Sequence, residues 1–172
     1  MVQVTLPASV QALVEMAPFE DVGLAVLKDA FPDVTVVSLI PSDAFTQESL
    51  LFLVRRVGGW GLWDGDARFM DSGSLSLQVF ASGSDADERA ALASEAIRVA
   101  MREAWREPKY YPGVGALVRV RVREEPVAKA DWATSSGPVQ YADLPKGWTR
   151  YETIYDLRVR RPLASWDARF PL

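Results

Sequence analysis

The sequence predicts an α+β fold: a mostly antiparallel sheet with two main helices packed on one face. Several segments alternate apolar and polar residues with the two-residue period of a strand, and one long segment has the period of a helix. Strands come first, then the long helix, then further strands, an order typical of α+β domains. The 172 residues suit one domain, so we treat 1–172 as a single domain.

The first part of the chain predicts one helix and two strands. A helix is expected between Pro18 and Pro32, where residues recur at helical spacing: Leu24, Leu27, Lys28 and Phe31. Residues 35–40 (TVVSLI) lie between two prolines and are rich in β-branched side chains, which predicts a first strand. Residues 49–57 (SLLFLVRRV) predict a second strand, and its apolar half should be buried on both faces.

A third strand and the long helix follow. The strand is predicted over 67–81, with an interruption near 71–73 (DSG) that either a bulge or a short hairpin would explain. The helix is predicted over 85–105, with Ser84 as its N-cap and Asp87 at the capping-box position. Its buried face should be rich in alanine, which would bring it close to the sheet: Ala86, Ala90, Ala93, Ile97, Met101 and Ala104.

Two more strands complete the predicted sheet. Residues 116–123 alternate three valines, expected on the buried face, with three arginines: Val118, Val120 and Val122 against Arg119, Arg121 and Arg123. The last strand covers 149–160, and its charged face is expected to be exposed: Arg150, Glu152, Asp156, Arg158 and Arg160. Residues 124–147 should form a long crossing segment. Only the connection through the long helix looks long enough for a parallel crossover.

The chain contains no cysteine and no histidine. This excludes a disulfide framework, thiolate or imidazole catalysis, and zinc sites built from these residues. Carboxylate, lysine or tyrosine chemistry stays open, as does a protein without chemistry. We expect no catalytic residues, no cofactor and no metal.

Charge is distributed unevenly along the chain. Residues 1–80 have 4 basic and 10 acidic side chains (net −6), and residues 81–172 have 15 basic and 13 acidic (net +2). Such a chain suits head-to-tail association of copies, although a solvated surface is the more common explanation. The net charge of −4 argues against a general nucleic-acid coat. No segment has the length of a membrane span or the features of a signal peptide, so we expect a soluble protein without membrane contact.

The Gly-rich segment 58–66 (GGWGLWDGD) is a predicted loop and a first candidate site. Its glycines match no phosphate-binding motif, because the segment leads into a strand rather than a helix. Asp64 and Asp66 lack the further ligands of a calcium loop, so a solvated turn is favoured over a metal site. Trp60 and Trp63 would expose apolar surface on such a loop. We therefore consider Trp60, Trp63, Asp64 and Asp66 a candidate partner-docking loop, with a loop folded back on the core as the alternative.

Arginines on the last two strands form a second candidate site. A row of arginines could position nucleic-acid phosphates. Glu152 and Asp156 would instead pair with such a row across the sheet, so a mixed-charge face or a subunit contact is favoured. The candidate subunit-contact residues are Arg119, Arg121, Arg123, Arg158 and Arg160.

Several short motifs occur in order along the chain. They are LVRRVGG over 53–59, DAR over 66–68, LSLQVFAS over 75–82, DADERA over 85–90 and YETIYDLRVR over 151–160. In this order they resemble tail terminator proteins of long-tailed, siphovirus-type phages, especially those that infect actinobacteria. The resemblance covers about residues 19–162, between an irregular amino-terminal segment and a Pro-containing tail. It implies a small α+β protomer related in fold to the lambda-type terminator.

The resemblance also implies a structural virion protein without enzymatic activity. Such a protein forms a homohexameric ring that stops polymerisation of the major tail tube protein and offers a surface to a head-completion or connector protein. Genomic DNA would pass through the ring without sequence-specific binding. The protein would be located at the head-proximal neck of the virion tail, after assembly in the host cytoplasm. Alternatives are a head-closure or connector protein, a carboxylate-dependent enzyme using Asp64 and Asp66, and a monomeric binding module using Trp60 and Trp63.

Overall fold

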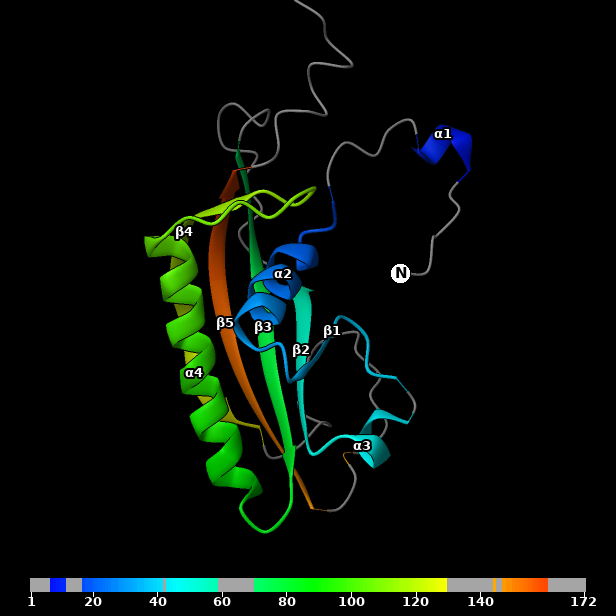
Figure 1. The fold of residues 1–172 in the computed structure, drawn as a ribbon, viewed down its shortest axis with the longest axis vertical. Helices are drawn as coiled ribbons and strands as arrows, with labels where there is room; N and C mark the ends of the chain where they lie inside the picture. Colours follow the sequence, from blue (N-terminus) through cyan, green and yellow to red (C-terminus); the bar gives the residue numbers. More distant parts are fainter. Residues whose placement is uncertain are drawn as a thin grey trace, which may run out of the picture.

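The computed structural model describes residues 7–11, 17–41, 43–58, 70–129, 144 and 147–160. Within them, five strands form one sheet, and two long helices pack on the same face of it (Figure 1). The elements are α1 (Ala8–Gln11), α2 (Glu20–Ala30), β1 (Thr35–Val37), α3 (Ala44–Gln47), β2 (Leu50–Val57), β3 (Met70–Ser82), α4 (Ala86–Arg106), β4 (Ala116–Ala128) and β5 (Trp148–Arg160). This arrangement confirms the predicted α+β class.

The sheet has the strand order β1-β2-β3-β5-β4. All neighbours from β2 to β4 are antiparallel, whereas β1 pairs with β2 in parallel. The prediction that only the long helix could make a parallel crossover was wrong, because residues 38–49 make one between β1 and β2. That segment, which includes α3, has about the dozen residues that a parallel connection needs. The long helix α4 connects β3 to β4, and these two strands run parallel on either side of β5.

The central strand β3 runs without a break through residues 71–73. Its pairing with β5 continues from Met70 to Ser82 without a shift, so the predicted interruption, as a bulge or a hairpin, was wrong. Gly73 is needed because the ring of Phe19 occupies the place of a side chain. A Cβ on Gly73 would lie 2.9 Å from Phe19 Cε1. The glycine therefore marks a close contact between the sheet and the segment that leads into α2.

Helix α4 presents the predicted alanine-rich face to the sheet. Its buried residues are Ala86, Ala90, Ser94, Ile97 and Met101, and Ala93 and Ala104 are partly buried against the same core. The predicted N-cap was wrong: Asp85, not Ser84, precedes the first turn, and its side chain makes no capping hydrogen bond. Asp87 accepts a hydrogen bond from Tyr151 Oη at 3.1 Å. The start of α4 is therefore joined to the last strand.

Helix α2 confirms the helix expected between Pro18 and Pro32. The buried positions are Val22, Gly23, Val26 and Leu27. Leu24 and Phe31 are only partly buried, and Lys28 is exposed. Gly23 lies at the contact with the sheet, where a Cβ would come within 2.7 Å of Val54 Cγ1.

Strand β4 is longer than predicted and less regular. It extends to Ala128, so the first part of the predicted crossing segment 124–147 is strand. A register shift against β5 lies between Leu117 and Arg119, and Val118 within it is 41% exposed. The expectation that Val118 is buried was therefore wrong, because the irregularity moves this residue out of the alternating pattern. Val120 and Val122 are partly buried against the core, as predicted.

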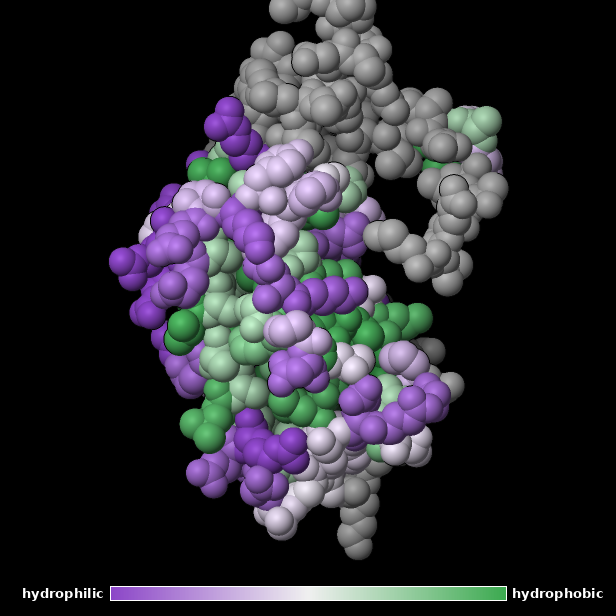
Figure 2. Space-filling view, in the orientation of Figure 1, coloured by the Kyte–Doolittle hydropathy of each residue, from purple (hydrophilic) through white to green (hydrophobic). Residues whose placement is uncertain are grey.

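The side of the molecule that carries the helices exposes both hydrophilic and apolar residues (Figure 2). Hydrophilic residues gather along the outer side of α4, and apolar residues lie in the middle of the face, where α2 packs. Three large apolar side chains of α4 are exposed: Leu92, Val99 and Trp105. None of the described helices is both long and apolar enough to cross a membrane.

We predict that Gly23→Ala destabilises the protein, although alanine is the better helix former. A Cβ at this position would lie 2.7 Å from Val54 Cγ1 and 3.0 Å from Leu75 Cδ1, so α2 would have to move away from the sheet. The expected loss is about 1–3 kcal/mol in the free energy of unfolding, measured by urea denaturation. Gly58→Ala is the matched control, since its Cβ would have no neighbour within 4 Å. Equal stability of the two variants would contradict the close packing of α2.

Candidate functional site

The sheet face that points away from α2 and α4 changes in character from one edge to the other. Beside β1 and β2 it is apolar, since Leu51, Leu53 and Phe80 are buried there with Ala44 of α3. Across β3 and β5 the buried residues are polar. Along β4 the face is basic. The predicted subunit-contact arginines belong to this last part.

Polar side chains in the middle of the face form a hydrogen-bond network. Ser76 Oγ donates to Glu152 Oε1 at 2.5 Å, and Gln78 Nε2 donates to the same oxygen at 3.2 Å. Arg150 Nη1 donates to Gln78 Oε1 at 3.4 Å, and its Nη2 lies 3.9 Å from Glu152 Oε2. Arg150 is only 3% exposed. The prediction that Arg150 and Glu152 lie on an exposed face was wrong, because the network buries the first and half-buries the second.

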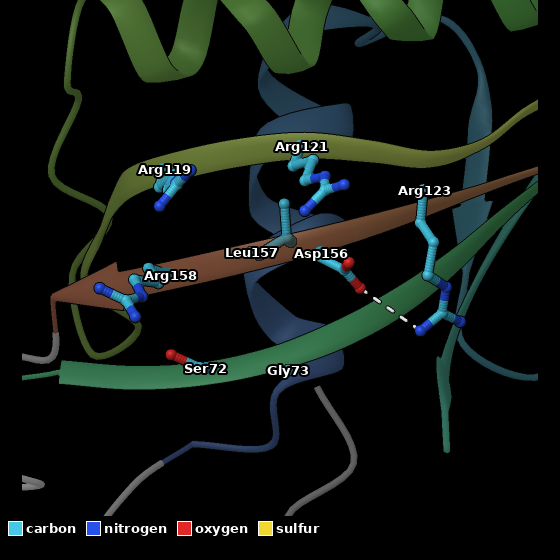
Figure 3. A pocket seen from close by; sticks show the side chains of 8 residues that line it. All are labelled: Ser72, Gly73, Arg119, Arg121, Arg123, Asp156, Leu157 and Arg158. Carbon is cyan, nitrogen blue, oxygen red and sulfur yellow. Dashed lines mark hydrogen bonds and ion pairs between the residues drawn. The ribbon is translucent and has the colours of Figure 1, made fainter. Parts of the chain in front are cut away.

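Next to this network the face is hollowed into a cavity of about 350 Å³, which we call the arginine cavity (Figure 3). It is lined by Ser72, Gly73, Arg119, Arg121, Arg123, Asp156, Leu157 and Arg158. Four of the five predicted subunit-contact arginines therefore meet at one place. The fifth, Arg160, is exposed at the end of β5 and does not line the cavity.

Strand register explains why the arginines gather. Beyond the irregularity at Leu117, alternate positions of β4 place Arg119 and Arg121 on one face. Arg123 lies in a second register shift, between Val122 and Glu124, and contacts Asp156 on the same face. Arg119 lies directly opposite Arg158 of β5, and Arg121 lies opposite Asp156. Figure 3 shows these side chains over the same stretch of β4 and β5, with Ser72 and Gly73 of β3 beside them. Like charges directly opposite each other on neighbouring strands are destabilising.

One carboxylate lines the arginine cavity, and Arg123 binds it. Arg123 Nη1 is 3.4 Å from Asp156 Oδ1 and 3.1 Å from Ser74 Oγ, and Ser74 donates to Asp156 at 2.7 Å. The predicted cross-strand pairing thus holds for this pair. Arg158 has an interaction partner as well. Arg119 and Arg121 form no ion pair with any residue that the structure describes, so the cavity keeps an excess of positive charge.

Chemically, the arginine cavity can bind anions. Guanidinium groups bind carboxylates and phosphates through paired hydrogen bonds. They stay positively charged at neutral pH, so they do not act as an acid or a base. Among the described residues, no three acidic side chains come together as a metal site. On the other face of the sheet, burial raises the pKa of the Tyr155 phenol far above its ordinary value, so this group stays protonated. The described chemistry is recognition of negative charge.

The two predicted sites differ in what the structure says of them. Trp60, Trp63, Asp64 and Asp66 lie outside the described residues, so the docking loop stays a prediction. Ser72 and Leu157 line the cavity, and sequence reasoning missed them. Leu157 was expected on the last strand, whereas Ser72 fell in the expected interruption at 71–73. No local pattern gives the register that brings both residues beside the arginines of β4.

Two arginines of this face should respond very differently to replacement by alanine. We predict that Arg150→Ala lowers the free energy of unfolding by about 3 kcal/mol or more, because it breaks a buried charged network. Arg121→Ala should change it by less than about 0.5 kcal/mol, because this exposed side chain has no ion pair in the described structure. Urea denaturation of the two variants checks this. Similar losses from both would mean that the cavity is part of the stabilising network.

Comparison with known proteins does not assign a function to the arginine cavity. No protein-family model matches the chain, and no curated protein matches it at a significant level. The case for a function therefore rests on the fold, on this cavity and on the sequence motifs.

Proposed function

We propose that the protein is a structural subunit of a phage tail, a tail terminator that forms a homohexameric ring on the end of the tail tube. The ring stops polymerisation of the major tail tube protein and provides the surface that a head-completion or connector protein binds. Genomic DNA passes through it without sequence-specific binding. In this proposal the protein has no catalytic role, and it is located at the head-proximal neck of the virion.

The observation that carries the proposal is the arginine cavity. Its positive charge is unbalanced within the described part of the chain, and it lies on the sheet face opposite α2 and α4. It is also next to β4, which pairs with β5 on one side and with no described strand on the other. A charged hollow beside the last strand of the described sheet suits contact between macromolecules. It does not suit acid–base catalysis, since its single carboxylate is bound to Arg123.

A ring of identical subunits requires two unlike surfaces that bind each other. In such a heterologous contact one surface of a subunit meets a different surface of the next, and closure of the ring prevents growth into a filament. The described structure offers a basic surface on one side of the sheet and acidic residues on the helix side. The two halves of the chain also differ in net charge, which favours attraction between copies of the protein.

The sequence motifs give a second line of support. LSLQVFAS over 75–82 lies in β3, DADERA over 85–90 spans the beginning of α4, and YETIYDLRVR over 151–160 lies in β5. The part of LVRRVGG that the structure describes is the end of β2. The motifs that the structure describes therefore fall on three adjacent strands and on the helix that packs against them, whereas DAR over 66–68 lies outside the described residues. A resemblance spread over a contiguous part of the fold supports a shared architecture better than a single motif would.

We predict that the protein is found at the head-proximal end of tails, as a ring, when tagged particles are viewed by electron microscopy. Light scattering coupled to size exclusion gives its oligomeric state in solution, with and without tail tubes. Density at the tail tip alone would contradict the proposal. Density attached to the head in the absence of tails would favour the alternative, a head-closure or connector protein.

The candidate docking loop has its own test. We predict that Trp60→Ala combined with Trp63→Ala leaves the fold intact by circular dichroism but reduces the joining of heads to tails, because aromatic side chains often anchor such contacts. Trp105→Ala is the matched control, since this tryptophan is exposed on α4. A normal yield of joined virions from the double variant would show that the loop has no docking role.

A further inference from the structure

We propose that the arginine cavity of one subunit receives the acidic first turn of α4 from the next subunit. We call this segment the acidic turn, and it consists of Asp87 and Glu88 in the first turn together with Asp85, the residue just before the helix. The inference rests on the proposed ring, and it names the two surfaces that would meet at each junction of that ring.

The cavity requires negative charge from outside the described fold. Register places Arg119 directly opposite Arg158, a like-charged pair across neighbouring strands. The carboxylate of Asp156, opposite Arg121, lies within ion-pair distance of Arg123 instead. Arg119 and Arg121 are both exposed and form no ion pair with any described residue. An anion that enters the cavity would balance the charges of Arg119 and Arg121 and accept paired hydrogen bonds from them.

The acidic turn is the densest group of available carboxylates in the described structure. Its three residues are exposed, and no lysine or arginine that the structure describes forms an ion pair with them. Asp87 accepts one hydrogen bond, from Tyr151. Several other carboxylates already have a basic partner: Asp29 with Lys109, Glu95 and Glu125 with Arg98, and Glu103 with Arg102. The acidic turn is therefore the surface whose charge best complements the cavity.

The geometry of one subunit excludes contact between its own cavity and its own acidic turn. Ser72, near the start of β3, lines the cavity, and the acidic turn follows the end of β3. The strand from residue 72 to residue 82 is about 33 Å long, at about 3.3 Å per residue. Figure 1 shows the beginning of α4 at the opposite end of the sheet from the start of β4. A second copy must supply the acidic turn, and the resulting contact is heterologous, as a ring requires.

The size of the cavity fits a protein segment with more than one carboxylate. Its volume of about 350 Å³ is in the range of sites that hold small molecules. Several guanidinium groups can then bind several carboxylates at once. A junction of this kind weakens at high salt, because exposed charges are screened over about 10 Å at ordinary ionic strength.

Cross-linking tests the inference directly, because the natural chain has no cysteine. Ser72→Cys places a thiol at the cavity, and Ser84→Cys places one beside the acidic turn, on an exposed residue. The two single-cysteine proteins are mixed and treated with a short bismaleimide, both free in solution and on tail tubes. We expect a cross-linked dimer from this mixture. A mixture of Ser72→Cys with Ser38→Cys, which is exposed beside β1, is the control and should give none.

Neutral variants identify the charges that hold the junction. Arg119→Gln with Arg121→Gln, introduced into the Ser72→Cys protein, should lower the cross-linked fraction by about tenfold or more, as expected for removal of complementary interface charges. Asp85→Asn, Asp87→Asn and Glu88→Gln in the Ser84→Cys protein should do the same. Arg106→Gln, an exposed change of the same kind in the last turn of α4, should have no effect.

The outcomes separate this inference from the proposed function. Rings that form on tail tubes without a cross-link between positions 72 and 84 would overturn the inference and leave the ring in place. Absence of both rings and cross-links would overturn both. If duplex DNA prevents the cross-link and its binding requires Arg119 and Arg121, the cavity is a phosphate site, and the inference is wrong.

Discussion

The pairing of β3 with β5 is the constraint on which the rest of the structure depends. These strands run beside each other in unbroken register through the middle of the sheet, so each residue on them is assigned to one of two faces. Leu75 and Leu77 pack in the core on the helix side, and Ser76 and Gln78 belong to the polar network on the other side. A shift by one residue would exchange the two sets, exposing the core and burying the charges. The core and the candidate contact face are therefore fixed by the same register.

The buried network and the arginine cavity are neighbouring parts of one face with different roles. In the network, Arg150 and Glu152 lie within ion-pair distance and both contact Gln78, so their opposite charges offset each other inside the protein. In the cavity, β4 places Arg119 opposite Arg158, and the nearby carboxylate is taken by Arg123. Arg119 and Arg121 therefore keep their charges without an ion pair to any described residue. An acidic surface of another molecule could bind them, which is why the functional proposal rests on the cavity rather than on the network.

Local patterns predicted most of the elements, because strict alternation and helical spacing occur in single segments such as α4 and β5. They failed where contacts between residues far apart in the sequence determine the structure. The interruption expected at 71–73 is a continuous strand in which Gly73 makes room for the ring of Phe19, and the parallel pairing of β1 with β2 has no local signature. The arginines were recognised as candidates, but their gathering around one cavity was not. It depends on the register between β4 and β5, which contains shifts and joins strands separated by a long segment.

The central claim is that the arginine cavity is a junction between subunits. A reconstruction of the assembled tail neck by electron cryomicroscopy, at a resolution that shows side chains, tests it most directly. We expect Arg119 and Arg121 to be covered by the neighbouring subunit, with carboxylates of its acidic turn within hydrogen-bond distance of their guanidinium groups. A ring in which both arginines face solvent or the DNA channel would contradict the claim.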